Sequence, residues 1–449
     1  MNLYNSARTP AIICTFVFLF TAIPTRTATA QTNQPPVVDL PVVDSDNFAD
    51  GFRPPSMSQS VALSAGFYEV AHDILGDSLK KRPRLSKWLV GLFDIGVTLV
   101  APMPLSDVWL HEEFHRAVMS NRGIGSFNDV YKFAIGEDAI YVSRVKDDDL
   151  VRLKRDHPAD LARLHVAGIE GEYALVQRLQ RNTFFRPTGG FHRPLYWLVK
   201  VSSAGYVGSA TSSDVITDTR ESERDEGTDI PRRDFAGHDF TAWIYDMSRR
   251  EEPYTARGIH PSGVGIRRYI TPDMLTEEER SFLDRQGKLQ YVNLADPHLF
   301  GIDAWKTGST RWNATAGHLL TPFGYTLDLN VLMSRGGRNV AVTFHSYSNN
   351  EQSFPGVDIE LVKVPLEIAG RELSASPRLS VWSQPDELRF RTDQGRPGGL
   401  IGLRLDSPLS QRVSTFVETS IKTEGWVMGN VHLDSDFELQ FGVSIIPRM

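Results

Sequence analysis

The sequence predicts an α+β protein in which a helical N-terminal region is followed by an antiparallel β-barrel. Apolar residues recur at helical spacing from about residue 62 to about residue 215, and shorter helical segments follow. After about residue 310 they alternate with polar residues, and turn residues recur about every 10–15 positions. We therefore expect a helical domain over 61–305 and a barrel domain of about eight to ten strands over 310–449.

Residues 1–30 have the features of a secretory signal peptide. Arg8 supplies a positive charge, residues 11–23 form a short apolar core, and an Ala-Thr-Ala cleavage site ends at Ala30. Cleavage would also remove Cys14, the only cysteine of the chain. An exported protein without disulfides is typical of a bacterial cell envelope.

The composition of the rest of the chain is that of a folded protein without a nucleic-acid partner. Residues 31–60 are rich in proline, aspartate, serine and asparagine, which predicts a disordered linker. The chain has a formal charge of −7 and no long basic run, which argues against nucleic-acid binding. Charged residues make up 23% of it, which is ordinary for a globular protein.

The helical region divides into several blocks. Residues 86–103 are strongly apolar but too short and too polar for a membrane span, which favours a buried helix. Further helical blocks are expected over 147–181 and 193–210. An exposed polar loop over 211–233 should then lead to an irregular helical annex over 236–305.

The alternation after residue 310 predicts strands with one apolar and one polar face. It is clearest at Phe437, Leu439 and Phe441, and it recurs over 327–333 and 357–361. A meander of this size closes into a barrel or folds into a sandwich, because open edges promote aggregation. In an exported protein, alternating strands of about ten residues favour an outer-membrane barrel over the alternative of a soluble periplasmic protein.

The most specific pattern in the chain is an H-E-x-x-H motif, His111-Glu112-Glu113-Phe114-His115. Its two histidines lie one turn apart on a helix, so both can bind one zinc ion through ring nitrogens. Zinc acidifies its bound water, and the glutamate after the first histidine can accept the proton. The motif therefore predicts metal-assisted hydrolysis.

Helix signals surround this motif. Ser106 or Asp107 can cap the N-terminus of a helix of about 15 residues, and Gly123 can end it. Asp107 also lies one turn before His111 and could orient its ring. The motif is thus expected inside a helix, where its two histidines share one face.

A tetrahedral catalytic zinc site needs a third protein ligand and leaves one position for water. Without a mature cysteine that ligand has to be His, Asp or Glu, and residues 165–173 offer the best candidates. We favour Glu170 over Glu172 and His165, because nearby glycines permit two helices to approach closely. Glu170 and Glu172 point about 200° apart on a helix, so only one of them can face the ion.

On these residues the chain resembles the zincin metallopeptidases. In the gluzincin arrangement a His-Glu-x-x-His helix is joined by a glutamate from a later helix. The resemblance covers residues 105–123 and, loosely, 165–175, and it implies zinc with both motif histidines as ligands and Glu112 as general base. The chain departs from the pattern at Ala174, where many gluzincins have an acidic residue.

The sequence as a whole predicts an exported zinc metallopeptidase of the cell envelope, which acts on peptide or protein substrates and associates with the outer membrane. Glu112 would take a proton from zinc-bound water and return it to the leaving amine. Residues that could stabilise the oxyanion are His238, Tyr245 and His260. The alternative is a non-enzymatic outer-membrane barrel whose helical half is a plug or scaffold.

Overall fold

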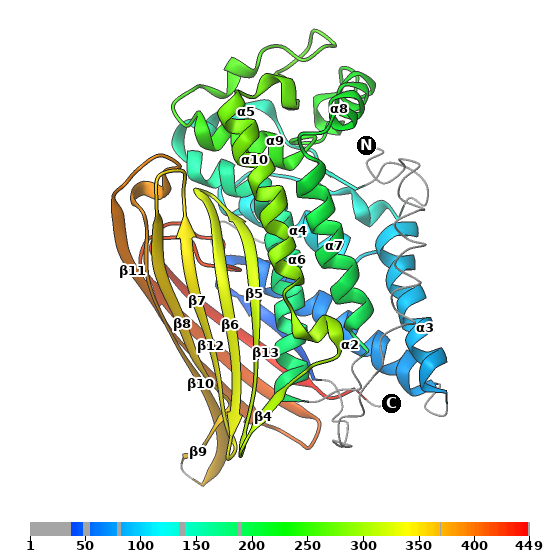
Figure 1. The fold of residues 1–449 in the computed structure, drawn as a ribbon, viewed down its shortest axis with the longest axis vertical. Helices are drawn as coiled ribbons and strands as arrows, with labels where there is room; N and C mark the ends of the chain where they lie inside the picture. The colour runs from blue at the N-terminus through cyan, green and yellow to red at the C-terminus, as the bar shows by residue number, and fades with distance from the viewer. Residues whose placement is uncertain are drawn as a thin grey trace.

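The computed structural model describes residues 37–47, 54–78, 82–133, 140–186, 191–368 and 370–447. In this part of the chain, a helical layer packs into the concave side of one curved antiparallel sheet (Figure 1). The expected signal peptide and the start of the expected linker lie outside the described residues. The prediction of an α+β fold with an antiparallel sheet is confirmed.

The helices fall mostly where the spacing of apolar residues predicts them. In chain order they are α2 Met57–Ser78, α3 Pro83–Ile95, α4 Asp107–Asn121, α5 Asp147–Asp156, α6 Pro158–Phe185, α7 Arg193–Ser209, α8 Ser213–Asp225, α9 Asp239–Ser248 and α10 Glu277–Leu289. The blocks expected over 147–181 and 193–210 correspond to α5 with α6 and to α7. Short 3-10 helices separate and follow α9 and α10, as expected for an irregular annex.

The strands follow the alternation of apolar and polar residues. They are β1 Val38–Asp44, β4 Trp305–Thr307, β5 Thr310–Thr321, β6 Gly324–Arg335, β7 Arg338–Ser348, β8 Ser353–Val362, β9 Val364–Ile368, β10 Arg371–Pro385, β11 Gly395–Pro408, β12 Val413–Lys422 and β13 Asp436–Ile445. A separate small sheet pairs β2 Phe127–Asn128 with β3 Val142–Ser143.

The large sheet has 11 strands in the order β1-β13-β12-β11-β10-β8-β7-β6-β5-β4, with β9 beside β10. Strands that follow one another in sequence are mostly neighbours, as in the predicted meander. Within the described residues β1 and β4 form the two ends of the order and do not pair with each other. The antiparallel sheet is therefore confirmed, whereas its closure into a barrel is not.

Residues 38–44 form an edge strand, which differs from the disordered linker expected over 31–60. β1 pairs antiparallel with β13, where Val38 lies opposite Ile445. Pro41 has no N–H to donate, and proline is tolerated in an edge strand because one side of that strand has no partner strand. The register shifts just after Pro41. Composition alone could not reveal this strand, because its partner lies at the other end of the chain.

The segment expected to be an exposed loop over 211–233 contains α8. Ser212 caps this helix by accepting a hydrogen bond from the backbone N–H of Val215. Val215, Thr219 and Glu223 lie four positions apart and are all buried, so one side of the helix packs against the protein. The sequence did not indicate this helix, because most residues between these three are polar or charged.

Helix α3 is less buried than expected for the apolar segment over 86–103. It continues into a π-helical turn over Gly96–Val100, and its outer side exposes Trp88, Leu89 and Leu92. In the part of the chain that the structure describes, no helix has both the length and the apolar character needed to cross a membrane.

The helical and the β regions share one hydrophobic core. Trp243 of α9 is fully buried, and its indole N–H donates to the backbone carbonyl of Thr321 at 3.0 Å. Arg163 of α6 donates to the carbonyl of Val431, between β12 and β13, at 3.1 Å. The boundary expected near residue 305 is thus a change of secondary structure, and side chains from both sides of it pack together.

The buried imidazole of His318 is expected to make the fold sensitive to acid. Its Nε2 contacts the amide oxygen of Gln286 at 3.0 Å, and burial lowers its pKa from 6.5 to about 3. Below pH 6.5 the unfolded chain therefore binds a proton that the folded chain excludes until about pH 3. Relative to a His318→Gln variant, stability should fall as the pH decreases from 6.5, by up to about 1.4 kcal/mol per pH unit.

Urea unfolding of both proteins between about pH 5 and pH 8 measures this difference, because the other titrating groups are shared and cancel. A stability difference that does not change with pH would contradict the prediction.

Candidate metal centre

The H-E-x-x-H motif lies on α4, as predicted. Ser106 caps the helix by accepting a hydrogen bond from the backbone N–H of Trp109, and Gly123 follows the helix end with a φ of +67°. His111 and His115 are consequently one helical turn apart, and both are buried. Local sequence signals are enough to explain this part of the site.

The two motif histidines meet a carboxylate at the start of α9. His111 Nε2 lies 3.4 Å and His115 Nε2 lies 3.7 Å from Oδ2 of Asp239. Ligand atoms of these three residues all lie within 4.8 Å of one another. Two ligands that each lie about 2.0–2.2 Å from one zinc ion can be at most about 4.4 Å apart. The distances from Asp239 to both histidines are within this limit.

Each imidazole ring is also held by a hydrogen bond at its Nδ1 atom, on the side away from Asp239. His111 Nδ1 contacts a carboxylate oxygen of Glu172 at 2.8 Å, and Ser203 donates to the other oxygen of Glu172. His115 Nδ1 lies 2.5 Å from the backbone carbonyl of Leu164. Metal-binding histidines generally use one ring nitrogen for such a partner and the other for the ion. Both rings here have this arrangement, with Nε2 on the side of Asp239.

Two glycines of α6 permit the close approach of α6 to α4. A Cβ atom at Gly168 would lie 2.1 Å from His111 Nε2, and one at Gly171 would lie 2.9 Å from the ring of Phe114. No larger side chain fits at either position unless the neighbouring ring moves. The sequence-based expectation that small residues near Glu170 bring two helices together is therefore confirmed.

The charges of the cluster suit a cation. Burial opposes ionisation of Asp239, but His115 and His111 lower its pKa to about 2, so it is a carboxylate at neutral pH. Burial lowers the pKa of His115 to about 4, which leaves this ring neutral, as metal binding requires. Burial also opposes protonation of His111, yet hydrogen bonds to Asp239 and Glu172 raise its pKa well above its ordinary value. The carboxylates of Asp239 and Glu172 therefore favour a positive charge at this position, and a bound metal ion would displace the proton of His111.

Glu112 is buried beside this cluster. Burial raises its pKa to about 8, and the charges of His111 and Asp239 act on it as well. A cation held by the three donor residues would oppose this rise and favour the ionised carboxylate.

Glu170 lies elsewhere, which corrects its assignment as the third ligand. Both of its carboxylate oxygens accept hydrogen bonds from Arg163, at 2.7 and 3.3 Å. They also accept from the backbone N–H of Gly429 at 2.8 Å and from the indole N–H of Trp426 at 3.3 Å. Glu170 thus connects α6 to the loop after β12, and Glu172 is the acidic residue of α6 that contacts the motif histidine.

The remaining candidates also have other partners. His165 contacts Asp246 at 2.9 Å in a buried cluster of charges. Asp107 accepts hydrogen bonds from the hydroxyls of Tyr68 and Thr98 at 2.7 and 2.8 Å, so it does not orient His111.

Among the three residues considered for the oxyanion, only His238 lies beside the cluster. His238 precedes Asp239, and its ring packs 4.8 Å from that of Tyr206, whose hydroxyl donates to Asp239 at 3.0 Å. Tyr245 packs instead under the guanidinium of Arg249. His260 contacts Ser262. The sequence predicted a functional role for His238, whereas its neighbour Asp239 is the residue that joins the site.

The chain is a mixed α+β protein with a candidate His-His-Asp metal centre. Comparison with protein-family models and with curated proteins finds no match for it. Two imidazole nitrogens and a carboxylate form a donor set of the kind that catalytic zinc sites use, with one position left for water.

Proposed function

We propose that the chain is an exported zinc-dependent hydrolase that cleaves peptide or protein substrates. One observation carries this proposal. The Nε2 atoms of both motif histidines face Asp239, while their Nδ1 atoms form hydrogen bonds with Glu172 and with the carbonyl of Leu164. The proposed ligands are His111, His115 and Asp239. Asp239 thus takes the place that Glu170 would have in a gluzincin arrangement.

The motif also supplies the residue that would handle the proton. Zinc held by these ligands would polarise a carbonyl group and lower the pKa of water. Glu112, buried next to His111, would accept a proton from the attacking water and pass it to the leaving amine. Glu172 and Tyr206 would act as positioning residues, because each contacts a proposed ligand by a hydrogen bond.

The other candidate function is a plug or scaffold without catalysis. The helical layer fills the concave side of the sheet, as a plug would (Figure 1). In this case the histidines and Asp239 would stabilise the fold by their hydrogen bonds alone, and the chain would have no specific affinity for zinc.

Zinc content distinguishes the two functions. We expect the full chain, purified without chelators and dialysed against dilute zinc, to hold one zinc ion per molecule by elemental analysis. It should also hydrolyse a mixed peptide library. His111→Ala should lose both properties, and His432→Ala, a half-buried histidine paired with Asp46, should retain both. Wild-type protein that takes up well under one equivalent of zinc would favour the plug.

A further inference from the structure

The convex face of the sheet carries continuous rows of apolar side chains. One row crosses seven strands from β6 to β13, and each member lies opposite the next in the antiparallel register. Its members are Val331, Val342, Ile359, Leu379, Ile401, Ile421 and Phe437. The last five expose 40–67% of their surface. A soluble protein would normally cover such a row.

Neighbouring rows of the same face are apolar as well. One consists of Leu329, Phe344, Val357 and Val381. Another consists of Ala375, Leu405, Val417 and Phe441. On β10 the band runs from Val381 to Ala375, which is about 20 Å along a strand. This height is comparable with the apolar band of about 25 Å on outer-membrane barrels.

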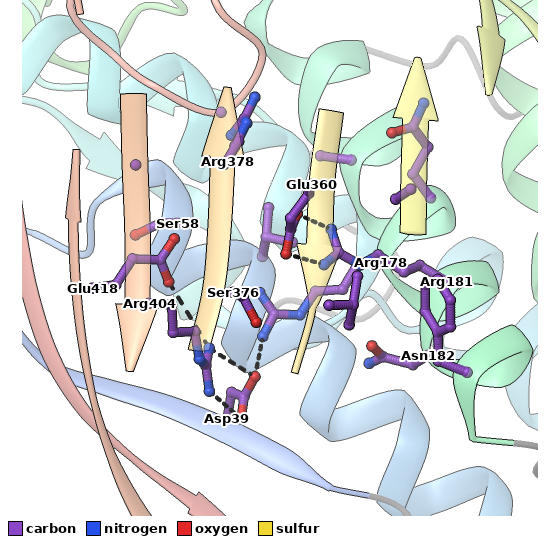
Figure 2. A pocket seen from close by; sticks show the side chains of 18 of the residues that line it. Asp39, Ser58, Arg178, Arg181, Asn182, Glu360, Ser376, Arg378, Arg404 and Glu418 are labelled. Atoms are coloured by element: carbon purple, nitrogen blue, oxygen red, sulfur yellow. Dashed lines mark hydrogen bonds and ion pairs between the residues drawn. The ribbon is translucent and has the colours of Figure 1, made fainter. Parts of the chain in front are cut away.

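The residues next to this row in sequence point to the concave side and are mostly polar. They include Glu360, Arg378, Ser420 and Glu438. These residues line a cavity of about 480 Å³ between the sheet and α6. Figure 2 shows Arg178 and Arg181 of α6 reaching toward the sheet, where Arg181 pairs with Glu360 at 2.7 Å. This part of the sheet is thus polar inside and apolar outside, the reverse of a sheet in a soluble protein.

Segments of the helical region lie against the sheet near both of its ends. On the side of β1, the side-chain amide of Gln59 in α2 donates to the carbonyl of Pro41 at 3.2 Å. At the other end β4 is only three residues long, and the backbone N–H of Ala316 in β5 donates at 3.3 Å to the carbonyl of Ala295, which lies between two 3-10 helices. A sheet that lies in hydrocarbon needs such cover, because no water is present there to bind unpaired backbone groups.

The shape and chemistry of the apolar face indicate what covers it. It curves around the helical layer across neighbouring strands (Figure 1), so a globular partner or a second copy would contact only part of it. Hydrocarbon chains adapt to a curved surface and form no hydrogen bonds, which suits a band without charged side chains. We propose that the convex face of β6–β13 lies in the hydrocarbon region of a lipid bilayer, with the paired charges of the concave side enclosed by the protein.

This placement puts the candidate metal centre near one end of the strands. Arg181 of α6 contacts Glu360 within the height of the apolar band, whereas Glu170 reaches the loop after β12. Gly168, which lies against His111, is only two positions before Glu170. The centre would therefore lie toward the membrane surface, a statement that rests on the proposed function.

Single-cysteine variants can test the membrane placement. The only cysteine is Cys14, so a Cys14→Ser background has none. Ile401→Cys and, independently, Ile421→Cys place a polarity-sensitive fluorophore on the apolar band. Thr217→Cys on α8 is the matched control, because this exposed position lies in the helical region beyond the strand ends (Figure 1).

In phosphatidylglycerol–phosphatidylcholine vesicles we expect the chain to float with the lipid even at high salt. A lipid-attached quencher should act several-fold more strongly on the two band positions than on the control, and aqueous iodide should show the opposite order. Equal iodide quenching at all three positions, or release of the chain by salt, would overturn the proposal. Shielding that depends on protein concentration without vesicles would indicate a second copy and would also overturn it. None of these readouts requires zinc, so their failure would leave the proposed hydrolase untouched.

Discussion

Asparagine in place of Asp239 is expected to abolish stoichiometric zinc binding, whereas glutamine in place of Glu170 should leave it intact. The Asp239 carboxylate faces Nε2 of both motif histidines at 3.4 and 3.7 Å. Loss of this carboxylate should weaken zinc affinity by at least about 100-fold, because the loss of even an outer partner of a metal ligand costs 10–100-fold. Competition against a chromophoric chelator measures the affinity of each variant.

Glu170→Gln should instead lower the free energy of unfolding of the protein. Glu170 and Arg163 are both fully buried and form a two-pronged ion pair. Neutralising one partner leaves a buried positive charge without its counter-charge, which costs about 3–5 kcal/mol. Urea unfolding of the zinc-free protein measures this cost. Unchanged zinc affinity in Asp239→Asn, or zinc loss with full stability in Glu170→Gln, would contradict the ligand assignment.

Glu112→Gln is expected to retain zinc and lose hydrolysis. Glutamine has nearly the shape of glutamate, but it can neither accept the proton of the attacking water nor deliver it to the leaving amine. Acid–base assistance is typically worth 10²–10⁴-fold, so kcat should fall by about that factor. Zinc content is measured on the same samples, so that loss of the metal is separated from loss of the base.

Glu113→Gln provides the matched control for Glu112→Gln, because it makes the same substitution one position later in α4. Arg116 holds the Glu113 carboxylate at 2.6 and 2.8 Å, and the amide of Asn128 donates to it at 2.9 Å. This variant should lose stability but retain kcat per folded molecule. Equal activity of Glu112→Gln and wild type would refute the proposed mechanism.

The sequence could not decide which acidic residue of α6 faces the motif histidines, for a physical reason. Glu170 and Glu172 are both carboxylates of one helix near two glycines, so their spacing predicts only that one of them faces α4. The rotation of α6 is set by its partners on both sides. Arg163 and the loop after β12 bind Glu170, which leaves Glu172 on the side of His111.

The sequence by itself determined the features that depend only on residues close together in the chain. Ser106 and Gly123 delimit the motif helix, the four-residue spacing puts His111 and His115 on one face, and alternation defines most strands after residue 310. Only the tertiary structure decided that β1 joins the sheet, that α8 is a helix and that Asp239 completes the cluster. For β1 and Asp239 the partners are distant in the chain, and packing brings them together where no local pattern of residues can indicate it.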